Sequence, residues 1–436
     1  MSIKSDVELL SFPSSHHSFT RCFLDYVSRY GEKTALIDPH TNEELSFAQL
    51  RSEVSRIQQR LVGISKGSVI ATVCGNSIPI ILTYLAAIDL GAVVVPVNPA
   101  SKQYELDKYM TECRVECVLT EDDYARKVGE FLKQSKFDSI STIVLEELRK
   151  GECTVSDAQA ESDEEDTITT VNIVPPVLDF LVKDPMVDSF DLKCLRNLYV
   201  GAAKCEERLL QDLKHRLPDL KQIIQLFGLT EAGVLLFVTP AGNPHLSSVG
   251  RAMPGVQAKI LDQHGDQLGV NEIGNLMVQA PTLMQGYLGQ YELILATQEL
   301  CFISPPDGWF FTGDMASVDG DGFVYIVGRE KDMIKVRGWQ VNPYEIEEAI
   351  KANVVGVEDC AVVGANHEAD GQRPKAFIVG PADINDVVEF VKETFTSYKH
   401  LCAVEVVDFI PRNPSGKILR HELTSEPLQQ PSASDP

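Results

Sequence analysis

Three short stretches in the second half of the chain carry residues that could contact a nucleotide. The first, Gly308-Trp-Phe-Phe-Thr-Gly-Asp314, places a carboxylate after an apolar strand and a Thr-Gly turn. A carboxylate can accept hydrogen bonds from both hydroxyls of a ribose. In the second, Gly328-Arg-Glu-Lys-Asp-Met-Ile-Lys-Val-Arg-Gly338, Arg329 could approach the same sugar from the other side. The third, Pro411-Arg-Asn-Pro-Ser-Gly-Lys417, frames a turn with proline and glycine that can present the Lys417 side chain at a distance.

A fourth stretch, Gln225-Leu-Phe-Gly-Leu-Thr-Glu231, combines residue types suited to a nucleotide and a metal ion. The Phe227 ring can stack on a purine, and Gly228 lets the main chain approach that purine. The Thr230 hydroxyl can hydrogen-bond a phosphate, and Glu231 offers a hard oxygen ligand for Mg²⁺. An ordinary strand-to-helix turn is the alternative interpretation, because glycine followed by Thr-Glu is common.

Small residues end a predicted strand at Val200-Gly-Ala-Ala203. With side chains as small as those of Gly201, Ala202 and Ala203, a flat ring could lie against the main chain. A tightly packed strand end explains the same residues equally well, so this stretch leaves both interpretations open.

The first half of the chain alternates strand and helix patterns that could position these groups. Ser46-Phe-Ala-Gln49 is typical of a capping box, and apolar residues recur at helical spacing after it through Leu61. Short apolar runs predict buried parallel strands at 69–74, 93–97 and 117–120, with helices at 79–90 and 102–113. The pattern resumes with a strand near 171–177, a helix at 177–183, a strand at 195–200 and a helix at 206–216. This alternation predicts a doubly wound α/β layer.

The pattern changes after about residue 247 to shorter strands, 258–261 and 274–278, and turns rich in glycine and aspartate. We expect a small β-barrel or a distorted sheet there, with Asp319-Gly-Asp-Gly322 as a hairpin turn whose aspartates are structural. After Lys331, helices at 343–353 and 384–395 and strands at 360–363 and 375–379 predict a compact α+β unit. The acidic stretch 156–166 is expected to be a solvated loop.

Size and charge limit the classes of function. A chain of 436 residues exceeds one ordinary core, so two or more domains are expected. Its formal net charge of −24 disfavours nucleic acid and anionic membranes as partners. A polyphosphate ligand would therefore need a local basic cluster, and the sequence offers one at Arg329, Lys331, Lys335 and Arg337.

Targeting signals and metal motifs are missing from the sequence. Ten cysteines include no CxxC pair, and neither HExxH nor a Cys/His cluster occurs, so we expect free thiols and no structural zinc. No apolar stretch is long enough to span a membrane, and no signal peptide is evident. The chain ends Ser434-Asp435-Pro436, without the peroxisomal Ser-Lys-Leu tripeptide. We expect a cytoplasmic protein, with association with an organelle left open.

The order and spacing of these motifs resemble the adenylate-forming superfamily, which includes acyl-CoA synthetases, 4-coumarate–CoA ligases and luciferases. The resemblance implies a large N-terminal AMP-binding domain over residues 1–330, with doubly wound α/β layers and a small β-barrel-like subdomain at about 247–330. It also implies a small α+β C-terminal domain over 331–436 that rotates about a hinge at Lys331. Two positions depart from the family pattern, since Phe227 stands where tyrosine is usual and Lys204 where proline is usual.

The resemblance also assigns roles. Lys417 would contact the carboxylate and the α-phosphate during adenylation and stabilise the transition state electrostatically. Gly338 and its basic neighbours would form the loop that guides CoA, and Glu231 would bind Mg²⁺ beside Thr230. The residues expected to bind the nucleotide are Gly201, Ala202, Ala203, Gln225, Phe227, Gly228, Asp314, Arg329 and Lys331. The implied reaction converts a small-molecule carboxylic acid, ATP and CoA to acyl-CoA, AMP and pyrophosphate through an acyl-adenylate.

One family element is missing. Relatives carry a Ser/Thr/Gly-rich loop ending in Gly-x-Pro-Lys, whose amides and hydroxyls bind the β- and γ-phosphates. Here Asp166-Thr-Ile-Thr-Thr170 runs directly into Val171-Asn-Ile-Val-Pro-Pro176, which lies many tens of residues later in the family. The segment lost at Thr170/Val171 would also supply part of the α/β layer, so an exposed sheet edge or a rearranged layer is expected.

Two functions from different classes remain open. The chain is either an acid–CoA ligase, or a catalytically impaired pseudoenzyme or splice form. The second would bind AMP, acyl-adenylate or CoA, or regulate a full-length paralogue by association. A nicotinamide-dependent oxidoreductase is disfavoured, because no glycine fingerprint follows an early strand.

Overall fold

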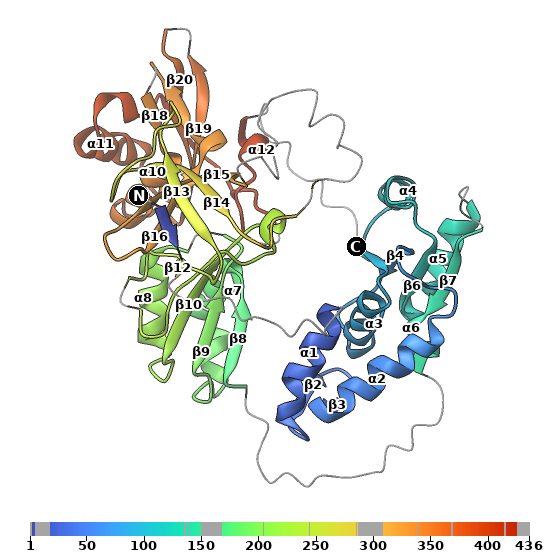
Figure 1. Ribbon diagram of the computed structural model, residues 1–436. Coiled ribbons are helices and arrows are strands. Elements are labelled where there is room, and N and C mark those ends of the chain that lie inside the picture. Colours follow the sequence, from blue (N-terminus) through green and yellow to red (C-terminus); the bar gives the residue numbers. More distant parts are fainter. Residues whose placement is uncertain are drawn as a thin grey trace. The chain divides into compact units, whose positions relative to one another are not determined.

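The computed structural model describes residues 2–4, 18–134, 137, 139–149, 168–203, 205–243, 245–284, 286, 308–337, 339–367, 369–413 and 416–424 (Figure 1). The chain divides into two compact units. Unit 1 comprises Met1–Leu9, Ser162–Gly286 and Glu292–Pro436, and unit 2 comprises Leu10–Glu161 and Tyr287–Tyr291. The predicted domain boundary at 330/331 stays a prediction, because this division groups the C-terminal α+β region with unit 1. The acidic stretch 156–166 lies outside the described residues.

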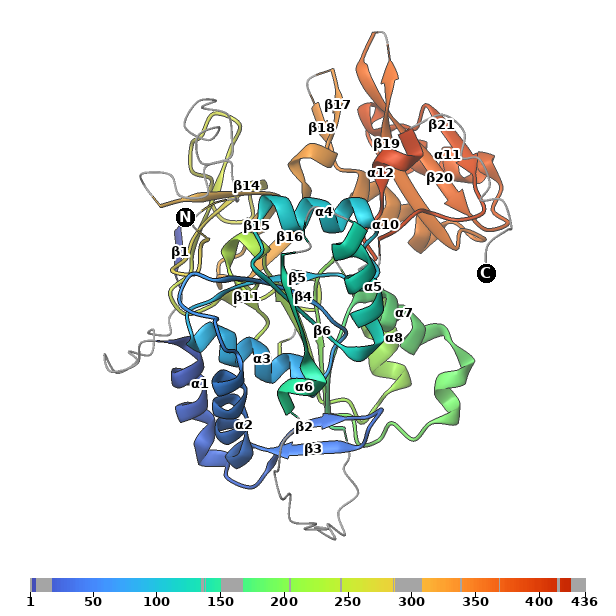
Figure 2. The same cartoon turned by 90° about the vertical axis from the view of Figure 1, so that its right-hand side faces the viewer.

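Unit 2 contains a doubly wound α/β layer, as predicted. Its parallel sheet has the order β5 (Val93–Val97), β4 (Val69–Val73), β6 (Cys117–Thr120) and β7 (Ser141–Val144). Neighbouring residues of β4 point to opposite faces: Ile70 packs with the helices of one face and Ala71 with those of the other. The first face bears α1 (Phe19–Val27), α2 (Phe47–Arg60), α3 (Ile78–Asp89) and α6 (Leu145–Arg149); the second bears α4 (Gln103–Glu112) and α5 (Asp122–Gln134) (Figure 2).

The helix starts in unit 2 follow local sequence signals. Ser46 and Gln49 form the predicted capping box at the start of α2, and Ser77 caps α3 through the amide of Ile80. Before α2, β2 (Thr34–Asp38) and β3 (Glu43–Ser46) form a hairpin.

The α/β sheet of unit 1 is built from a second βαβαβ run. Strands β8 (Thr170–Ile173), β9 (Asn197–Val200) and β10 (Gln222–Phe227) are parallel, and α7 (Pro175–Lys183) and α8 (Glu207–Arg216) connect them (Figure 1). Strands β11 (Phe237–Val238) and β12 (Arg251–Ala252) extend the sheet antiparallel. The carboxyl ends of β9 and β10 therefore lie at one edge, where parallel sheets commonly hold ligands.

Two expectations near the predicted deletion can be compared with this sheet. The strand predicted at 171–177 was too long: β8 ends at Ile173, and α7 begins at Pro175, because prolines at the first helical positions lose no intrahelical hydrogen bond. The expected sheet edge is present, since β8 pairs only with β9 among the described strands.

The β-rich part of unit 1 is one antiparallel sheet. Its order is β1 (Ser2–Lys4), β13 (Gln257–Leu261), β14 (Gly274–Gln279), β15 (Phe310–Val318) and β16 (Val324–Arg329). Both pairings of β15 contain register shifts, which agrees with the distorted sheet predicted as an alternative to a barrel. Asp319 stabilises the predicted hairpin turn structurally, because its carboxylate accepts from the amides of Asp321 and Phe323.

The sequence interpretation of Thr312-Gly-Asp314 as a turn after a short strand was wrong. Strand β15 continues through Asp314 to Val318. Gly313 adopts a φ of +72°, so the chain bulges within the strand and does not reverse. Asp314 pairs with Arg329 of β16 across this irregular ladder.

The C-terminal region is the predicted α+β unit. Strands β18 (Trp339–Val341), β17 (Ile334–Val336), β20 (Gly371–Val379) and β19 (Asp359–His367) form a sheet, with β21 (Ala403–Val406) also paired to β20. Helices α10 (Pro343–Asn353) and α11 (Ile384–Thr394) bury Ile346, Ile350 and Val387 in its core. The short helix α12 (Arg420–Thr424) packs on β19 through Leu423.

No helix in the described parts of the chain is both long and apolar enough to cross a membrane. The eight described cysteines are all free.

Candidate functional site

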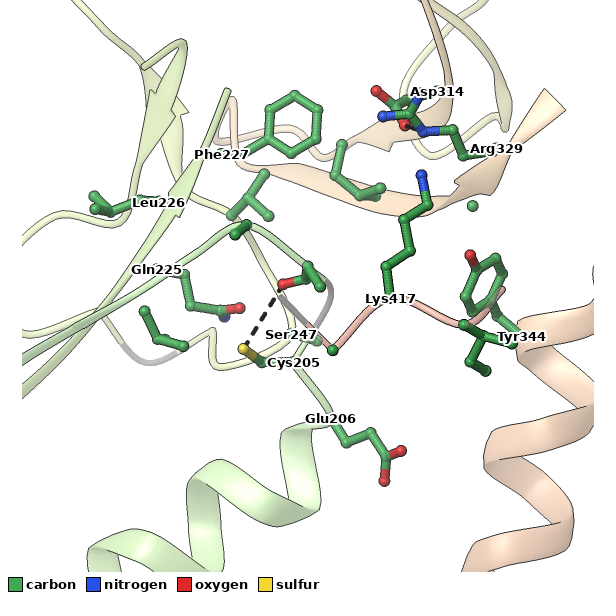
Figure 3. Close-up of a pocket in the computed structure, with 18 of the residues that line it drawn as sticks. Cys205, Glu206, Gln225, Leu226, Phe227, Ser247, Asp314, Arg329, Tyr344 and Lys417 are labelled. Atoms are coloured by element: carbon green, nitrogen blue, oxygen red, sulfur yellow. Dashed lines mark hydrogen bonds and ion pairs between the residues drawn. The ribbon is translucent and has the colours of Figure 1, made fainter. Parts of the chain in front are cut away.

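A pocket in unit 1 lies where the carboxyl ends of β9 and β10 meet the β15–β16 ladder and the turn that bears Lys417 (Figure 3). It gathers residues that are far apart in the sequence. Of the predicted site residues, it is lined by Ala202, Ala203, Gln225, Phe227, Gly228, Asp314, Arg329 and Lys417.

Asp314 is the buried acid of this pocket. Its Oδ1 forms an ion pair with Nε of Arg329 at 2.8 Å, and its Oδ2 is buried without a hydrogen-bond partner among the described residues. Burial raises the pKa of Asp314 to about 6, although the Arg329 charge acts in the opposite direction. A buried acceptor without a donor is costly, so this oxygen is suited to a ligand hydroxyl.

Lys417 contributes the second charge. Its side chain extends from the turn toward Asp314 and Arg329 (Figure 3). Burial lowers the pKa of Lys417, and the neighbouring Arg329 charge lowers it further, while Asp332 and Asp314 oppose this effect. The pocket thus places two cationic side chains near one carboxylate.

The main chain after β9 forms one wall of the pocket. Gly201 does not line it: a Cβ there would lie 2.9 Å from the carbonyl oxygen of Leu226, so this glycine allows β9 and β10 to approach closely. Ala202 lines the pocket with a φ of +74°, a strained value for a residue with a side chain. Both interpretations of this stretch therefore apply, a packed strand end at Gly201 and a pocket wall at Ala202 and Ala203.

Phe227 and Gly228 continue this wall from the end of β10. The Phe227 ring packs at an angle on Phe237, with ring centroids 5.8 Å apart, and also lines the pocket (Figure 3). Gly228 is required by packing, because a Cβ there would lie 1.6 Å from the carbonyl oxygen of Val234. From the sequence, Gly228 was explained only by the approach of a ligand, and the structure adds that the neighbouring main chain leaves no room for a side chain there.

Gln225 holds a neighbouring loop in place. Its amide Nε2 donates to the carbonyl of Ser248 at 3.0 Å and also to that of Leu246. Ser248 in turn donates to the carbonyl of Val324 at 2.8 Å. The side chain is buried, so Gln225 shapes the pocket by fixing the segment that contains Ser247 and Val249.

Thr230 and Glu231 lie in the 3-10 turn Thr230–Ala232 and are not among the residues that line the pocket. Thr230 is exposed, and Glu231 is half-buried. Glu231 is nevertheless close enough to Asp314 for its charge to contribute to the raised pKa of Asp314. Glu231 is thus a neighbour of the pocket's acid, one layer outside the lining.

The basic cluster predicted from the sequence does not converge on the pocket. Arg337 pairs with Asp370, which also binds Arg373, and Lys335 is exposed on β17. Lys331 is exposed in the 3-10 turn Glu330–Asp332, although its charge reaches Lys417. The hairpin of β17 and β18 carries the two later residues away from Arg329, and the predicted CoA-loop residue Gly338 lies outside the described residues.

A buried ion pair that sequence reasoning missed lies behind Lys417. Glu347 of α10 pairs with Arg420, and its Oε1 accepts from the amide of Val362 at 2.6 Å. Arg420 also donates to the carbonyl of Val362 at 2.7 Å and stacks over the ring of Tyr344, a pocket residue. A signal for this pair was present in the sequence: Glu347 lies on an otherwise apolar face of the helix, three positions after Tyr344 and one turn before Ile350.

A second missed ion pair joins Glu206, at the start of α8, to Lys351 of α10. Burial alone would lower the pKa of Lys351, but the Glu206 carboxylate outweighs it and raises the pKa. Next to this pair lies Cys205, whose thiol contacts the carbonyl of Ala203 (Figure 3). Burial raises the pKa of Cys205 to about 12, so it is a packing group and not a nucleophile at neutral pH.

The pocket therefore combines three chemical features. It has a buried carboxylate oxygen that needs a donor, two cationic side chains beside it, and an aromatic ring next to a wall of small residues. A ligand with sugar hydroxyls, an anionic group and a flat ring matches all three.

Comparison with known proteins agrees with this geometry. The family model described as "AMP-binding enzyme" matches residues 23–167 and 160–288, and "AMP-binding enzyme C-terminal domain" matches residues 345–417. The first model matches in two segments that overlap at residues 160–167, close to the predicted deletion. A 4-coumarate–CoA ligase of Pinus taeda is 37% identical over 267 residues, which are 59% of this chain and 48% of the relative. This chain thus spans about half the length of the curated relatives it matches.

Solved structures show the same fold. ATP-bound MatB from Rhodopseudomonas palustris superposes with a TM-score of 0.73 at 21% identity, covering 92% of this chain and 98% of that chain. The anthranilate CoA ligase AuaEII in complex with anthranoyl-AMP gives 0.75 at 20% identity, covering 92% of this chain and 96% of that chain. The family model covers more than half of this chain, and the chain therefore belongs to the AMP-binding enzymes of the adenylate-forming superfamily.

Proposed function

We propose that the pocket binds an adenine nucleotide by its ribose. Asp314 would accept hydrogen bonds from the ribose hydroxyls, Arg329 would hold the carboxylate in its charged form, and adenine would lie between Phe227 and the Ala202–Ala203 main chain. The observation that carries this assignment is Oδ2 of Asp314, which is buried in the pocket and accepts no hydrogen bond from any described residue.

Adenosine titration by isothermal calorimetry tests the assignment. The full chain should bind adenosine, and Asp314→Asn should weaken binding by about tenfold or more, because hydrogen bonds to a charged acceptor contribute about 1.5–3 kcal/mol. Asp212→Asn is the matched control, since this aspartate is exposed on α8 outside the pocket. Equal affinity of the wild type and Asp314→Asn for adenosine would remove the assignment.

The reaction we propose for this site is that of an acid–CoA ligase, which activates a carboxylic acid with ATP and transfers the acyl group to CoA. In the first half, a carboxylate oxygen attacks the α-phosphate and pyrophosphate leaves. Lys417 would stabilise the negative charge that develops on the α-phosphate, because its amine already lies beside the ribose-binding pair. The 4-coumarate–CoA ligase match supports this reaction class.

Glu231 is suited to be the protein ligand of the Mg²⁺ ion that this reaction requires. Mg²⁺ is commonly held by one or two carboxylates together with substrate phosphates and water, so a single carboxylate near Asp314 is a sufficient protein contribution. Thr230, in the same turn, would hydrogen-bond a phosphate. When bound, the ion would neutralise phosphate charge. CoA would enter by way of the hairpin of β17 and β18, beyond the hinge proposed at Lys331.

A second candidate is a nucleotide-binding protein with little or no turnover. Two observations favour it: the sequence contains no loop for the β- and γ-phosphates, and β8, which follows the deletion site, is a sheet edge among the described strands. Losing several phosphate donors could cost many orders of magnitude in rate, at about 10²–10³ for each donor. Such a protein could still bind AMP or acyl-adenylate, or associate with a full-length paralogue.

Acid-dependent exchange of labelled pyrophosphate into ATP separates the two candidates. Exchange that requires an added aromatic or fatty acid, and is lost in Lys417→Met, would establish the ligase. Adenosine binding without any exchange would establish the second candidate.

A further inference from the structure

We propose that Arg412 and Arg420 are positioning residues that clamp the turn bearing Lys417 in front of the Asp314–Arg329 pair. The inference rests on the proposed nucleotide site and adds to it a reason why Lys417 is held there. Two observations support it: hydrogen bonds hold both flanks of the turn, and the arginines on both flanks bind residues of the same strand, β19.

The turn itself is closed by several hydrogen bonds. Two hydrogen bonds join Asn413 and Lys417: the Asn413 amide donates to the Lys417 carbonyl at 3.0 Å, and the Lys417 amide donates to the Asn413 side-chain oxygen at 2.9 Å. The Gly416 amide donates to the Asn413 carbonyl at 2.8 Å. Gly416 also packs closely on Pro176 of α7, since a Cβ at Gly416 would lie 2.8 Å from the proline ring. The described residues of the turn are therefore tied to one another and to α7.

Arg412 ties the first flank of this turn to the sheet. One guanidinium nitrogen donates to the carbonyl of Gly416 at 2.9 Å, across the turn. The other donates to both carboxylate oxygens of Asp359, the first residue of β19, at 2.8 and 2.9 Å. This charge-assisted contact anchors the first flank of the turn at the start of β19.

Arg420 ties the second flank to the same strand. It donates to the carbonyl of Val362, also in β19, and pairs with the buried Glu347, which accepts from the Val362 amide. Tyr344 covers the guanidinium from the pocket side, 4.5 Å from the ring centroid. Lys417 thus lies between two arginine anchors that lead to β19.

Such anchors have a physical purpose at this position. The charge of Lys417 is repelled by Arg329 and Lys331 and attracted by Asp314 and Asp332, on the elements packed around the pocket. Glu231 acts on the neighbouring Asp314. A lysine stem has many rotamers, so an unanchored turn would let the amine move toward solvent, where desolvation and repulsion are both relieved. Holding the turn beforehand lowers the entropy lost when a phosphate binds.

The test compares affinities for AMP and adenosine, measured by calorimetry on the full chain near pH 8. The ratio of the adenosine Kd to the AMP Kd reports the phosphate contact alone. We expect a ratio of about ten or more in the wild type, a fall to near unity in Lys417→Met, and a fall of about threefold or more in both Arg412→Gln and Arg420→Gln. The adenosine Kd should stay within about twofold in the two arginine variants, because Asp314 is untouched.

Arg373→Gln is the matched control, because this arginine also pairs with a buried carboxylate, Asp370, in the same C-terminal sheet. It should leave the ratio unchanged. If Arg420→Gln does not fold, Arg412→Gln carries the test, since its pair with Asp359 is partly exposed. Three results would overturn the clamp: a wild-type ratio near one, an unchanged ratio in the folded arginine variants, or an equal fall in Arg373→Gln. A wild type that binds no adenosine overturns the nucleotide site, and the clamp with it.

Discussion

Two carboxylate–arginine pairs lie within unit 1 and differ in how fully their oxygens are used. Glu347 accepts from Arg420 with both oxygens and from the Val362 amide, and its side chain is 4% exposed beside an arginine that is 11% exposed. Asp314 is nearly as buried, at 5%, but its arginine is 33% exposed and one of its oxygens has no donor among the described residues. We call the first pair complete because both oxygens of its carboxylate accept hydrogen bonds within the protein, although Nε of Arg420 has no hydrogen-bond partner among the described residues. We call the second pair incomplete because one oxygen of its carboxylate is left for a ligand.

The comparison separates a structural pair from a binding pair. Burial raises the pKa of both acids, so burial and charge alone do not tell the two roles apart. What differs is the number of donors around each carboxylate. We infer that the pair with the unused acceptor binds the ligand, and the following predictions test this distinction.

The largest effect is expected from breaking the complete pair. Glu347→Ala leaves the Arg420 guanidinium buried without its partner, and this should lower the free energy of unfolding by about 3–5 kcal/mol. Urea denaturation measures the change. The double variant Glu347→Leu with Arg420→Met should recover most of the loss, because it removes both charges. A Glu347→Ala variant as stable as the wild type would contradict a structural role for this pair.

Removing the charge of Asp314, in the incomplete pair, should stabilise the protein at neutral pH. The pKa of Asp314 is raised to about 6, above its ordinary value, so its contribution to stability is full at low pH and is lost as pH rises through about 6. Asp314→Asn removes this cost and should be more stable than the wild type at pH 7 by up to about 3 kcal/mol, with the difference vanishing near pH 4. Thermal unfolding from pH 4 to pH 8 gives the profile. Loss of stability in Asp314→Asn at pH 7 would show that Asp314 acts as Glu347 does.

Ligand binding should follow the same titration. The charged form of Asp314 is the acceptor, so adenosine affinity should be constant above about pH 7 and fall by about tenfold per unit well below pH 6. Adenosine is the suitable probe because it has no phosphate that titrates in this range. An adenosine Kd that stays constant between pH 5 and pH 7 would show that Asp314 does not bind the ligand.

The smallest effect is expected at Glu206 and Lys351, a pair in which the glutamate is 42% exposed. Lys351→Met should change the free energy of unfolding by less than about 1 kcal/mol, because water can solvate the carboxylate that remains. If Lys351→Met lowered the free energy of unfolding as much as Glu347→Ala does, the exposure of an ion pair would not predict its contribution to stability.

Much of the fold was predictable from the sequence. The strands at 93–97 and 117–120 and the helix at 343–353 have the predicted bounds, because apolar runs, caps and prolines mark them locally. Thr312-Gly-Asp314 was misread as a turn because a glycine bulge within a long strand has the same local signature.

The candidate site was predicted only in part, because sequence motifs do not show which distant segments pack together or where alternate residues of a strand point. Asp314, Arg329 and Lys417 were recognised by motif, and the structure brings them together. The Glu347–Arg420 pair was missed because contact between α10, β19 and α12 depends on packing between distant segments. Lys335 and Arg337 were grouped with Arg329 by sequence distance, although alternation and the hairpin after β17 direct them elsewhere.

The most direct measurement compares adenosine with 2′,3′-dideoxyadenosine in the wild type and in Asp314→Asn. If the unused oxygen of Asp314 receives the ribose hydroxyls, removing them should weaken binding to the wild type by about tenfold or more and hardly affect Asp314→Asn. An equal loss in both proteins, or no loss in the wild type, would contradict the account.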